Sequence, residues 1–157
     1  MQHFIEIDDV MGALLQNTND KISPFLPNSK PVQPGILAGL KLLVVDDCEE
    51  NQFLFTHLLS RKGANVQIAG NGEEALTLVR NGSYDLILMD IQMPVMDGFS
   101  ALANLKEMGS FTPVIAITAE SLPAQIKKIL DAGFSSVVTK PLDKDYLLQV
   151  IQETIRA

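Results

Sequence analysis

The sequence is poor in cysteine, in positive charge and in long apolar runs, and each shortage excludes a class of protein. Its 157 residues include a single cysteine, Cys48, so no internal disulfide can form, and the lone thiol fits a reducing cytoplasm. No apolar run approaches the roughly 18 residues of a membrane span. The first residues lack the basic start and the apolar core of a secretory signal. We therefore expect a cytoplasmic protein with no direct membrane contact.

The balance of charge is acidic. The chain has 12 Lys and Arg residues against 19 Asp and Glu residues, which gives a formal net charge of −7. A surface that binds nucleic acid directly needs clustered Lys and Arg, so we do not expect one. With 46% hydrophobic and 20% charged residues, the composition is that of a soluble globular protein that can form one domain with a core and an extension.

Short apolar segments recur after residue 40 without alternating polar residues. They lie at residues 42–45, 66–68, 86–89, 114–117 and 137–138. Segments of this kind are typical of parallel strands that are covered on both faces. Helix-like segments lie between them, because crossovers between parallel strands must be right-handed and return to the sheet. We predict an α/β fold with a doubly wound, five-stranded parallel sheet.

Apolar spacing and end signals mark several of the helices. Apolar residues recur at three- and four-residue spacing at Leu122, Ile126, Ile129 and Leu130, and again at Leu147, Val150, Ile151 and Ile155. Pro123 stands in the first turn of the earlier segment and Gly133 just past its end. Asn71 followed by Glu74 predicts a helix cap, and Asp97 before a glycine predicts a turn and another cap.

The first 39 residues differ in character from the rest of the chain. Their apolar residues Phe4, Ile7, Met11 and Leu14 are spaced as in an amphipathic helix, and Pro24, Pro27, Pro31 and Pro34 follow. We divide the chain into residues 1–39, an N-terminal amphipathic helix and Pro-rich linker, and residues 40–157, the α/β domain. We expect the helix to dock on that domain or to form a homodimer contact.

Acidic, hydroxyl and basic side chains stand directly after four of the predicted strands. They are Asp46 and Asp47, Asp90, Thr118 and Lys140. Sheets of this type bind ligands outside the carboxyl ends of their strands. We therefore expect these side chains to meet at one rim of the sheet.

The chemistry of such a rim points to phosphoryl transfer. Three carboxylates at one site repel one another and take up protons unless a cation intervenes, and Mg²⁺ prefers carboxylate, water and phosphate oxygens. A carboxylate beside that cation can attack phosphorus and form an acyl phosphate. Lys140 and the hydroxyl of Thr118 can each donate to a phosphate oxygen. The sequence thus predicts a site that accepts a phosphoryl group.

With these motifs in their order, the chain resembles the receiver domain of two-component response regulators. The motifs lie at residues 44–47, 89–90, 93–94, 97–98, 117–119 and 140–141, and the resemblance covers about residues 40–156. It implies the flavodoxin-like fold of five βα units. Residues 36–41, together with residues 49–51 after the acid pair, resemble receivers carried at the end of hybrid histidine kinases, in which case residues 1–35 are the junction from an upstream kinase module. The alternative is a free-standing regulator.

The resemblance implies a role for each acid. Asp90 accepts the phosphoryl group from a phosphohistidine. Asp47 and Asp90 bind Mg²⁺ through their side chains, and the backbone carbonyl of Gln92 completes the protein ligands. Asp46 holds waters of the metal or contributes a ligand itself.

The remaining site residues follow from the same resemblance. Thr118 is the switch hydroxyl and Lys140 contacts the phosphate, in a position compatible with a cis bond to Pro141. Val137 stands where the family often has Tyr or Phe, so an aromatic rotamer cannot report the switch. Cys48 stands where Asn is frequent, and we assign it a structural or neutral role.

The resemblance also implies the partners. A histidine kinase or a histidine phosphotransfer protein exchanges phosphate with the domain, and a downstream protein binds the face formed by the fourth helix, last strand and last helix of the domain. The domain catalyses its own phosphorylation and dephosphorylation and is not otherwise an enzyme. The last helical pattern reaches Ile155, after which we expect no effector domain.

Two other functions are weighed against this one. A haloacid-dehalogenase-like, Mg²⁺-dependent phosphatase also forms an aspartyl phosphate, but that family expects a second acid two residues after the nucleophile, where this chain has Gln92. A binding module that works without phosphorylation does not need the full set of Asp90, Thr118 and Lys140. Both stay as alternatives.

Overall fold

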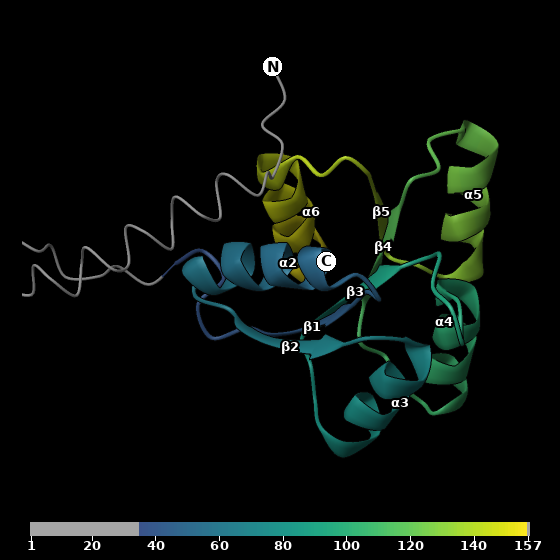
Figure 1. Cartoon of the computed structure of the whole chain (residues 1–157), viewed down its shortest axis with the longest axis horizontal. Helices are drawn as coiled ribbons and strands as arrows, with labels where there is room; N and C mark the ends of the chain where they lie inside the picture. The colour runs from purple at the N-terminus through teal and green to yellow at the C-terminus, as the bar shows by residue number, and fades with distance from the viewer. Residues whose placement is uncertain (1–34, 157) are drawn as a thin grey trace, which may run out of the picture.

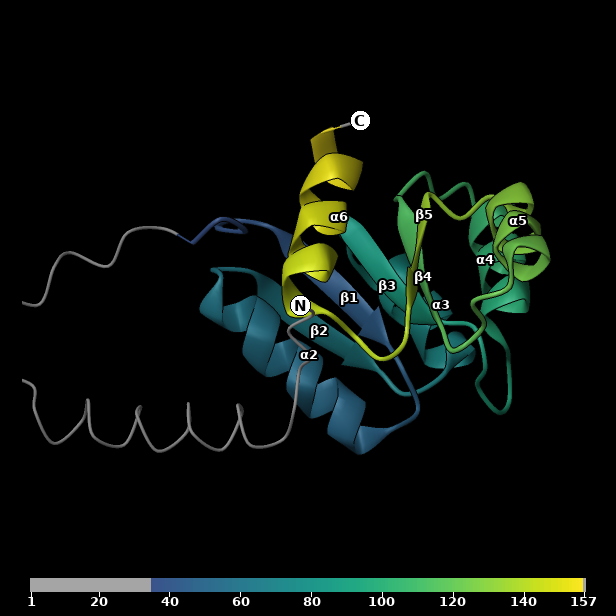
Figure 2. The same ribbon diagram turned by 90° about the horizontal axis from the view of Figure 1, so that it is seen from above.

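The structure, a computed structural model, describes residues 35–156 and forms one five-stranded parallel sheet with helices on both sides (Figures 1 and 2). The strands are β1 (Lys41–Val45), β2 (Asn65–Ala69), β3 (Leu86–Asp90), β4 (Val114–Thr118) and β5 (Ser136–Thr139). Their order in the sheet is β2-β1-β3-β4-β5, and every neighbouring pair is parallel. The predicted fold class is confirmed.

Two layers of helices cover the sheet. The helices are α2 (Glu49–Arg61), α3 (Gly72–Asn81), α4 (Gly98–Glu107), α5 (Pro123–Ala132) and α6 (Lys144–Arg156). Helices α2 and α6 pack on one face, and α3, α4 and α5 pack on the other (Figure 2). None of these helices has the length and hydropathy needed to cross a bilayer. The helix predicted from Phe4 to Leu14 lies outside the described residues.

Each central strand contributes side chains to both apolar layers. In β3, Leu86 and Leu88 join the cluster under α2 and α6, while Ile87 and Met89 join the cluster under α3, α4 and α5. Successive side chains of a strand point to opposite faces, so a strand covered on both sides must be apolar throughout. This explains the unbroken apolar run that ends in an acid.

Local hydrogen bonds define the helix ends that the sequence predicted. The side chain of Asn71 caps α3 by accepting from the N–H of Glu74 at 2.9 Å, and the carboxylate of Glu74 accepts in turn from Gly70 N–H at 2.6 Å. Asp97 caps α4 by accepting from Ser100 N–H at 2.8 Å. Gly133 ends α5 with a φ of 112°, a left-handed conformation that glycine adopts without strain. These predictions are confirmed.

Helix α5 differs from its predicted amphipathic pattern. Ile129 is buried against the sheet, but the side chains of Leu122 and Leu130 are 63% and 44% exposed. Helix α5 packs against β5, the edge strand of the sheet, and Leu122 is its N-cap residue, outside the helix itself. Apolar spacing therefore overestimated its buried face.

The segment before β1 packs against the domain. Leu37 stands before the predicted boundary at residue 40, yet its side chain is fully buried in the cluster under α2 and α6. Its N–H donates to the carbonyl of Lys62 at 2.8 Å. Side-chain packing on the sheet therefore begins before residue 40.

Candidate functional site

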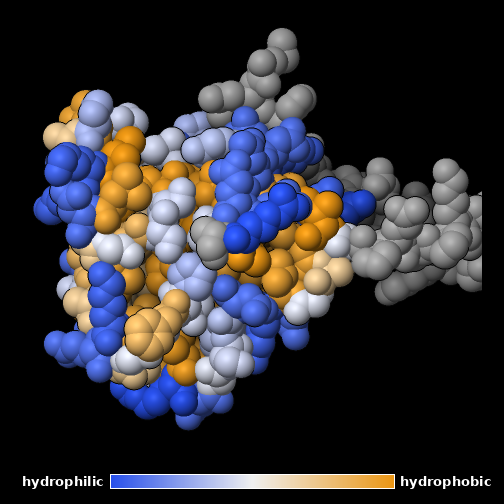
Figure 3. Space-filling view, turned by 180° about the vertical axis from the view of Figure 1, so that it is seen from behind, coloured by the Kyte–Doolittle hydropathy of each residue, from blue (hydrophilic) through white to orange (hydrophobic). Residues whose placement is uncertain are grey.

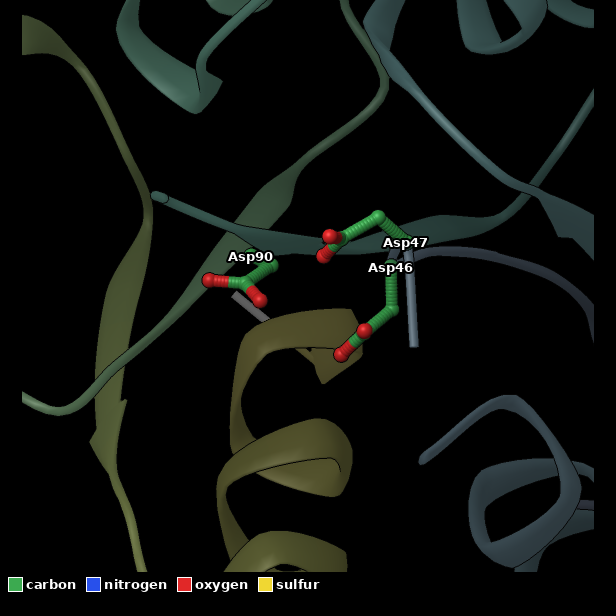
Figure 4. Close-up of side chains that lie close together, drawn as sticks. All are labelled: Asp46, Asp47 and Asp90. Atoms are coloured by element: carbon green, nitrogen blue, oxygen red, sulfur yellow. The ribbon is translucent and has the colours of Figure 1, made fainter. Parts of the chain in front are cut away.

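The acids that follow β1 and β3 meet at the carboxyl-end rim of the sheet. Val45 of β1 pairs with Met89 of β3, so the next residues, Asp46 and Asp90, lie side by side at the ends of the two strands. One carboxylate oxygen from each of Asp46, Asp47 and Asp90 lies within 4.8 Å of the others. Figure 4 shows the three side chains gathered around a common space. The strand register thus brings together all three predicted acids.

Asp46 is the most enclosed of the three acids. It is 1% exposed, and its Oδ1 accepts a hydrogen bond from Cys48 N–H at 2.8 Å. The amide nitrogen of Asn51 lies 3.5 Å from Oδ1 and 3.3 Å from Oδ2. Burial raises the pKa of Asp46, the bond from Cys48 N–H opposes this rise, and the nearby charge of Asp90 adds to it. A buried carboxylate of this kind is stabilised by an added cation.

Asp47 has a different environment from its neighbour. Its side chain is exposed, and no hydrogen bond to its carboxylate is found within residues 35–156. One of its carboxylate oxygens still lies within 4.8 Å of an oxygen of Asp46 and of Asp90. Of the two adjacent acids, Asp46 thus has hydrogen-bond donors to its carboxylate among the described residues, and Asp47 has none.

Asp90 ends the middle strand of the sheet and forms the ion pair of the site. It is 5% exposed, its Oδ1 accepts from Gln92 N–H at 3.0 Å, and its Oδ2 lies 3.2 Å from Lys140 Nζ. The chain reaches that position through a cis bond between Lys140 and Pro141, as predicted, and Lys140 N–H donates to the carbonyl of Thr118 at 2.7 Å. Both carboxylate oxygens of Asp90 thus have a donor.

Thr118 ends β4 beside this group but bonds elsewhere. It is 1% exposed, and its hydroxyl oxygen accepts from Glu120 N–H at 3.0 Å. Among the described residues, no hydrogen bond joins the hydroxyl of Thr118 to Asp90 or Lys140. Thr118, Gln92 and Glu120 are among the residues that line a hollow of about 540 Å³ at this rim. Because a hydroxyl is also a donor, its proton remains available to a new acceptor.

The loop between β3 and α4 turns back tightly against Asp90. Val95 has a φ of 71°, and Met96 N–H donates to the carbonyl of Pro94 at 2.8 Å, which together form a γ-turn. A Cβ atom at Gly98 would come within 2.7 Å of the carbonyl oxygen of Asp90. The sequence predicted a turn at this glycine but not this close approach, which only glycine permits.

The sequence alone did not identify two residues that contact Asp46 at this rim. Asn51 reaches the carboxylate of Asp46, and Gln52 donates through its side-chain amide to the backbone carbonyl of Asp46 at 2.6 Å. Both lie in the first turn of α2, among polar residues that carry no apolar spacing. Only the spacing from the acid pair, less than two helical turns, could have suggested them.

Comparison with known proteins places this arrangement in one family. The family model described as the response regulator receiver domain matches residues 42–152. Two-component response regulator 24 of Arabidopsis thaliana is 36% identical over 139 residues, which cover 87% of this chain and 94% of that protein. The hybrid signal transduction histidine kinase I of Dictyostelium discoideum is 36% identical over 124 residues, 73% of this chain and 7% of that kinase. The chain thus spans nearly all of one relative and a small part of the other.

Solved structures show the same likeness. The receiver domain of Francisella response regulator 1452 has a TM-score of 0.72 and 30% identity, covering 75% of this chain and 98% of that one. The receiver domain of the sensor histidine kinase PA1611 from Pseudomonas aeruginosa PAO1, solved with a magnesium ion in its active-site cleft, has a TM-score of 0.70 and 33% identity, covering 76% of this chain and 100% of that one. The comparisons do not favour the phosphatase alternative. The chain belongs to the response regulator receiver domains of two-component phosphorelay systems.

Proposed function

We propose that Asp90 is the residue that accepts the phosphoryl group, from a phosphohistidine on a histidine kinase or a histidine phosphotransfer protein. The observation that carries this proposal is the position of Asp90, between the acid pair and the ammonium group of Lys140 at 3.2 Å. A carboxylate oxygen of Asp90 attacks phosphorus, the phosphorus–nitrogen bond breaks, and its electron pair returns to the imidazole.

The three acids are the proposed ligands of Mg²⁺, together with the backbone carbonyl of Gln92. One carboxylate oxygen from each acid lies within 4.8 Å of the others, and carboxylate and carbonyl oxygens are ligands that suit Mg²⁺. When bound, Mg²⁺ would offset the negative charge of the carboxylates and of the phosphoryl oxygens. The magnesium ion in the receiver of the Pseudomonas kinase supports this assignment.

Lys140 and Thr118 are proposed to stabilise the transferred group. Lys140 pairs with the carboxylate of Asp90 in this structure. After transfer, the negative charge would lie on the phosphoryl oxygens, and Lys140 would donate to one of them. Thr118 would donate its proton to a second phosphoryl oxygen, which exists only after transfer. This contact differs between the two states, and only such a contact can shift a conformational equilibrium. The surface that responds is proposed to be the face of α5, β5 and α6.

The setting of this reaction is also a proposal. Relatives include both response regulators and hybrid histidine kinases, so the donor is a kinase or a phosphotransfer protein. The single, exposed Cys48 supports a reducing, cytoplasmic compartment. The domain would catalyse its own phosphorylation and dephosphorylation and turn over no separate substrate. The helix and linker predicted for residues 1–39 stay a proposal, except that Leu37 packs in the core of the domain.

The two ends of β3 provide the test of the phosphorylation site. Asp90 ends the strand in the acidic cluster, whereas Asp85 stands exposed just before the strand begins. With Mg²⁺ and acetyl phosphate, the wild type and Asp85→Asn should each gain a single acid-labile phosphate, measured by intact mass. Asp90→Asn should gain none. Full labelling of Asp90→Asn would overturn the proposal.

A further inference from the structure

The N-terminal end of α2, with its N-cap residue Cys48, contacts Asp46 at three points. Cys48 N–H donates to its Oδ1 at 2.8 Å, and the side-chain amide of Gln52 donates to its backbone carbonyl at 2.6 Å. The side-chain amide of Asn51 lies 3.5 Å and 3.3 Å from the two carboxylate oxygens. One helical turn thus holds both the backbone and the carboxylate of this acid.

Among these donors, Asn51 is the one whose side chain reaches the carboxylate of Asp46, so a substitution can remove its contact. The bond from Cys48 comes from the main chain and persists in side-chain variants. Gln52 reaches only the backbone carbonyl of Asp46. Within residues 35–156, Asn51 is therefore the side chain that donates to the carboxylate of Asp46.

The carboxylate needs such a partner because its neighbours repel it. Asp46 is 1% exposed and shares a cluster with two other carboxylates, so rotation about its side-chain bonds is the simplest way to relieve the repulsion. An amide donor near both oxygens opposes that rotation. Side chains on a helix lean toward its N-terminus, which directs Asn51 back to the end of β1.

We propose that Asn51 is a positioning residue that holds the carboxylate of Asp46 in place for the divalent cation. The inference rests on the proposed function, because it assumes that these acids bind Mg²⁺. Hydrogen-bond partners of metal-binding carboxylates orient them, and their loss typically weakens metal affinity by about 10-fold to 100-fold. Asp47, with no such partner among the described residues, would adjust to the ion after Asp46 is set.

Calorimetric titration of Mg²⁺ into the unphosphorylated full chain tests this role without any transfer reaction. Asn51→Leu keeps the approximate size of the side chain and removes the amide, and it should raise the dissociation constant by about 10-fold or more. Asn51→Gln keeps an amide donor and should bind more tightly than Asn51→Leu. Gln149→Leu removes an amide from an exposed position of α6 and should bind as the wild type does.

A double-mutant cycle decides whether the effect passes through Asp46. In an Asp46→Asn background, Asn51→Leu should change the affinity by less than about 2-fold, because interacting residues are not additive. An equal loss in both backgrounds would overturn the inference, as would wild-type affinity in Asn51→Leu. If Asn51→Leu does not fold, Asn51→Ser enters the same cycle.

The outcome also separates this inference from the proposed function. If the wild type binds no Mg²⁺ and gains no phosphate on Asp90, the proposed function fails. If the wild type binds Mg²⁺ and is phosphorylated while Asn51→Leu binds equally well, only the role of Asn51 fails.

Discussion

The two rims of the sheet use polar residues in opposite ways. At the carboxyl-end rim, Asp46, Asp90 and Thr118 are 1%, 5% and 1% exposed, and three carboxylates lie together. At the amino-end rim, Asp85 is exposed and bonds with Lys41 in both directions: Lys41 N–H donates to the Asp85 carboxylate at 2.8 Å, and Asp85 N–H donates to the Lys41 carbonyl at 2.8 Å. Figure 3, which views the molecule from behind Figure 1, shows apolar and polar side chains mixed over the surface.

The difference separates residues that pair with each other at the start of the strands from residues that we propose bind a ligand. Opposite or complementary groups pair at the amino-end rim, where Lys41 Nζ also lies 4.9 Å from the centre of the Tyr84 ring. At the carboxyl-end rim the buried carboxylates of Asp46 and Asp90 lie together. Burial and the repulsion between these carboxylates raise the pKa of Asp46, and the ion pair between Asp90 and Lys140 does not remove the repulsion. This arrangement destabilises the metal-free protein. The same kind of substitution should therefore affect phosphorylation and stability differently at the two rims.

The largest difference is expected in the rate of phosphorylation. Asp47→Ala removes a proposed Mg²⁺ ligand and should slow labelling by acetyl phosphate by at least about 100-fold, because the metal supplies several kcal/mol of charge stabilisation. Chelation of Mg²⁺ should have the same effect on the wild type. Asp85→Ala, at the other rim, should be labelled at the normal rate. Labelling that is insensitive to chelation would contradict the metal assignment.

A second difference is expected in stability, at two glycines. A Cβ atom at Gly98 would meet the Asp90 carbonyl at 2.7 Å, whereas one at Gly82 would have its nearest neighbour at an ordinary 3.4 Å. Gly98→Ala should lower the free energy of unfolding by about 1–3 kcal/mol, as overpacking does. Gly82→Ala should change it by roughly 0.5 kcal/mol or less. Chemical denaturation measures both, and equal values would show that the loop yields to the added methyl group.

The third comparison concerns the switch. Beryllium fluoride with Mg²⁺, a mimic of the phosphoryl group, should slow amide hydrogen exchange at the carboxyl-end rim and across α5, β5 and α6. The amino-end rim should change little. Thr118→Val keeps the shape of the side chain without its hydroxyl, and it should reduce the change in exchange at α5, β5 and α6 by about 5-fold or more, the lower end of typical coupling. Unchanged exchange in Thr118→Val would show that the switch bypasses this hydroxyl.

The smallest effect is expected from neutralising Asp46 in metal-free protein. The pKa of Asp46 in the folded state is raised above its ordinary value of 3.8, mainly by burial, so the folded state holds this proton more tightly than the unfolded state. Its contribution to stability is present below that ordinary value and is lost as the pH rises through the folded-state pKa. Asp46→Asn should therefore raise the melting temperature slightly at neutral pH in the presence of a chelator.

The pH dependence supplies the control for this last variant. The advantage of Asp46→Asn should shrink as the pH falls toward 3.8, and added Mg²⁺ should stabilise the wild type more than the variant. Asp85→Asn should show no such gain at neutral pH. If Asp46→Asn is less stable than the wild type at neutral pH, the hydrogen bonds to the ionised carboxylate of Asp46 stabilise the wild type more than its burial destabilises it.

Much of the fold was predictable because its signals are local. A strand buried on both faces must be apolar at every position, so β3 was visible as the run before Asp90. The caps at Asn71 and Asp97 were predictable because each joins groups three residues apart. Helix α5 was only partly predictable, since Leu122 and Leu130 follow helical spacing but remain exposed at the sheet edge.

By itself, the sequence determined the strands, the helix caps and the polar residues at the ends of four strands, because these depend on neighbours within a few positions. Only the tertiary structure decided which of those residues touch. The strand order β2-β1-β3-β4-β5 sets Asp46 beside Asp90, and it brings Lys140 to an acid 50 residues away. The packing of α2 on β1 brings the side-chain amide of Asn51 to the carboxylate of Asp46. Such contacts depend on how distant elements pair and pack, and no local pattern encodes the path between them.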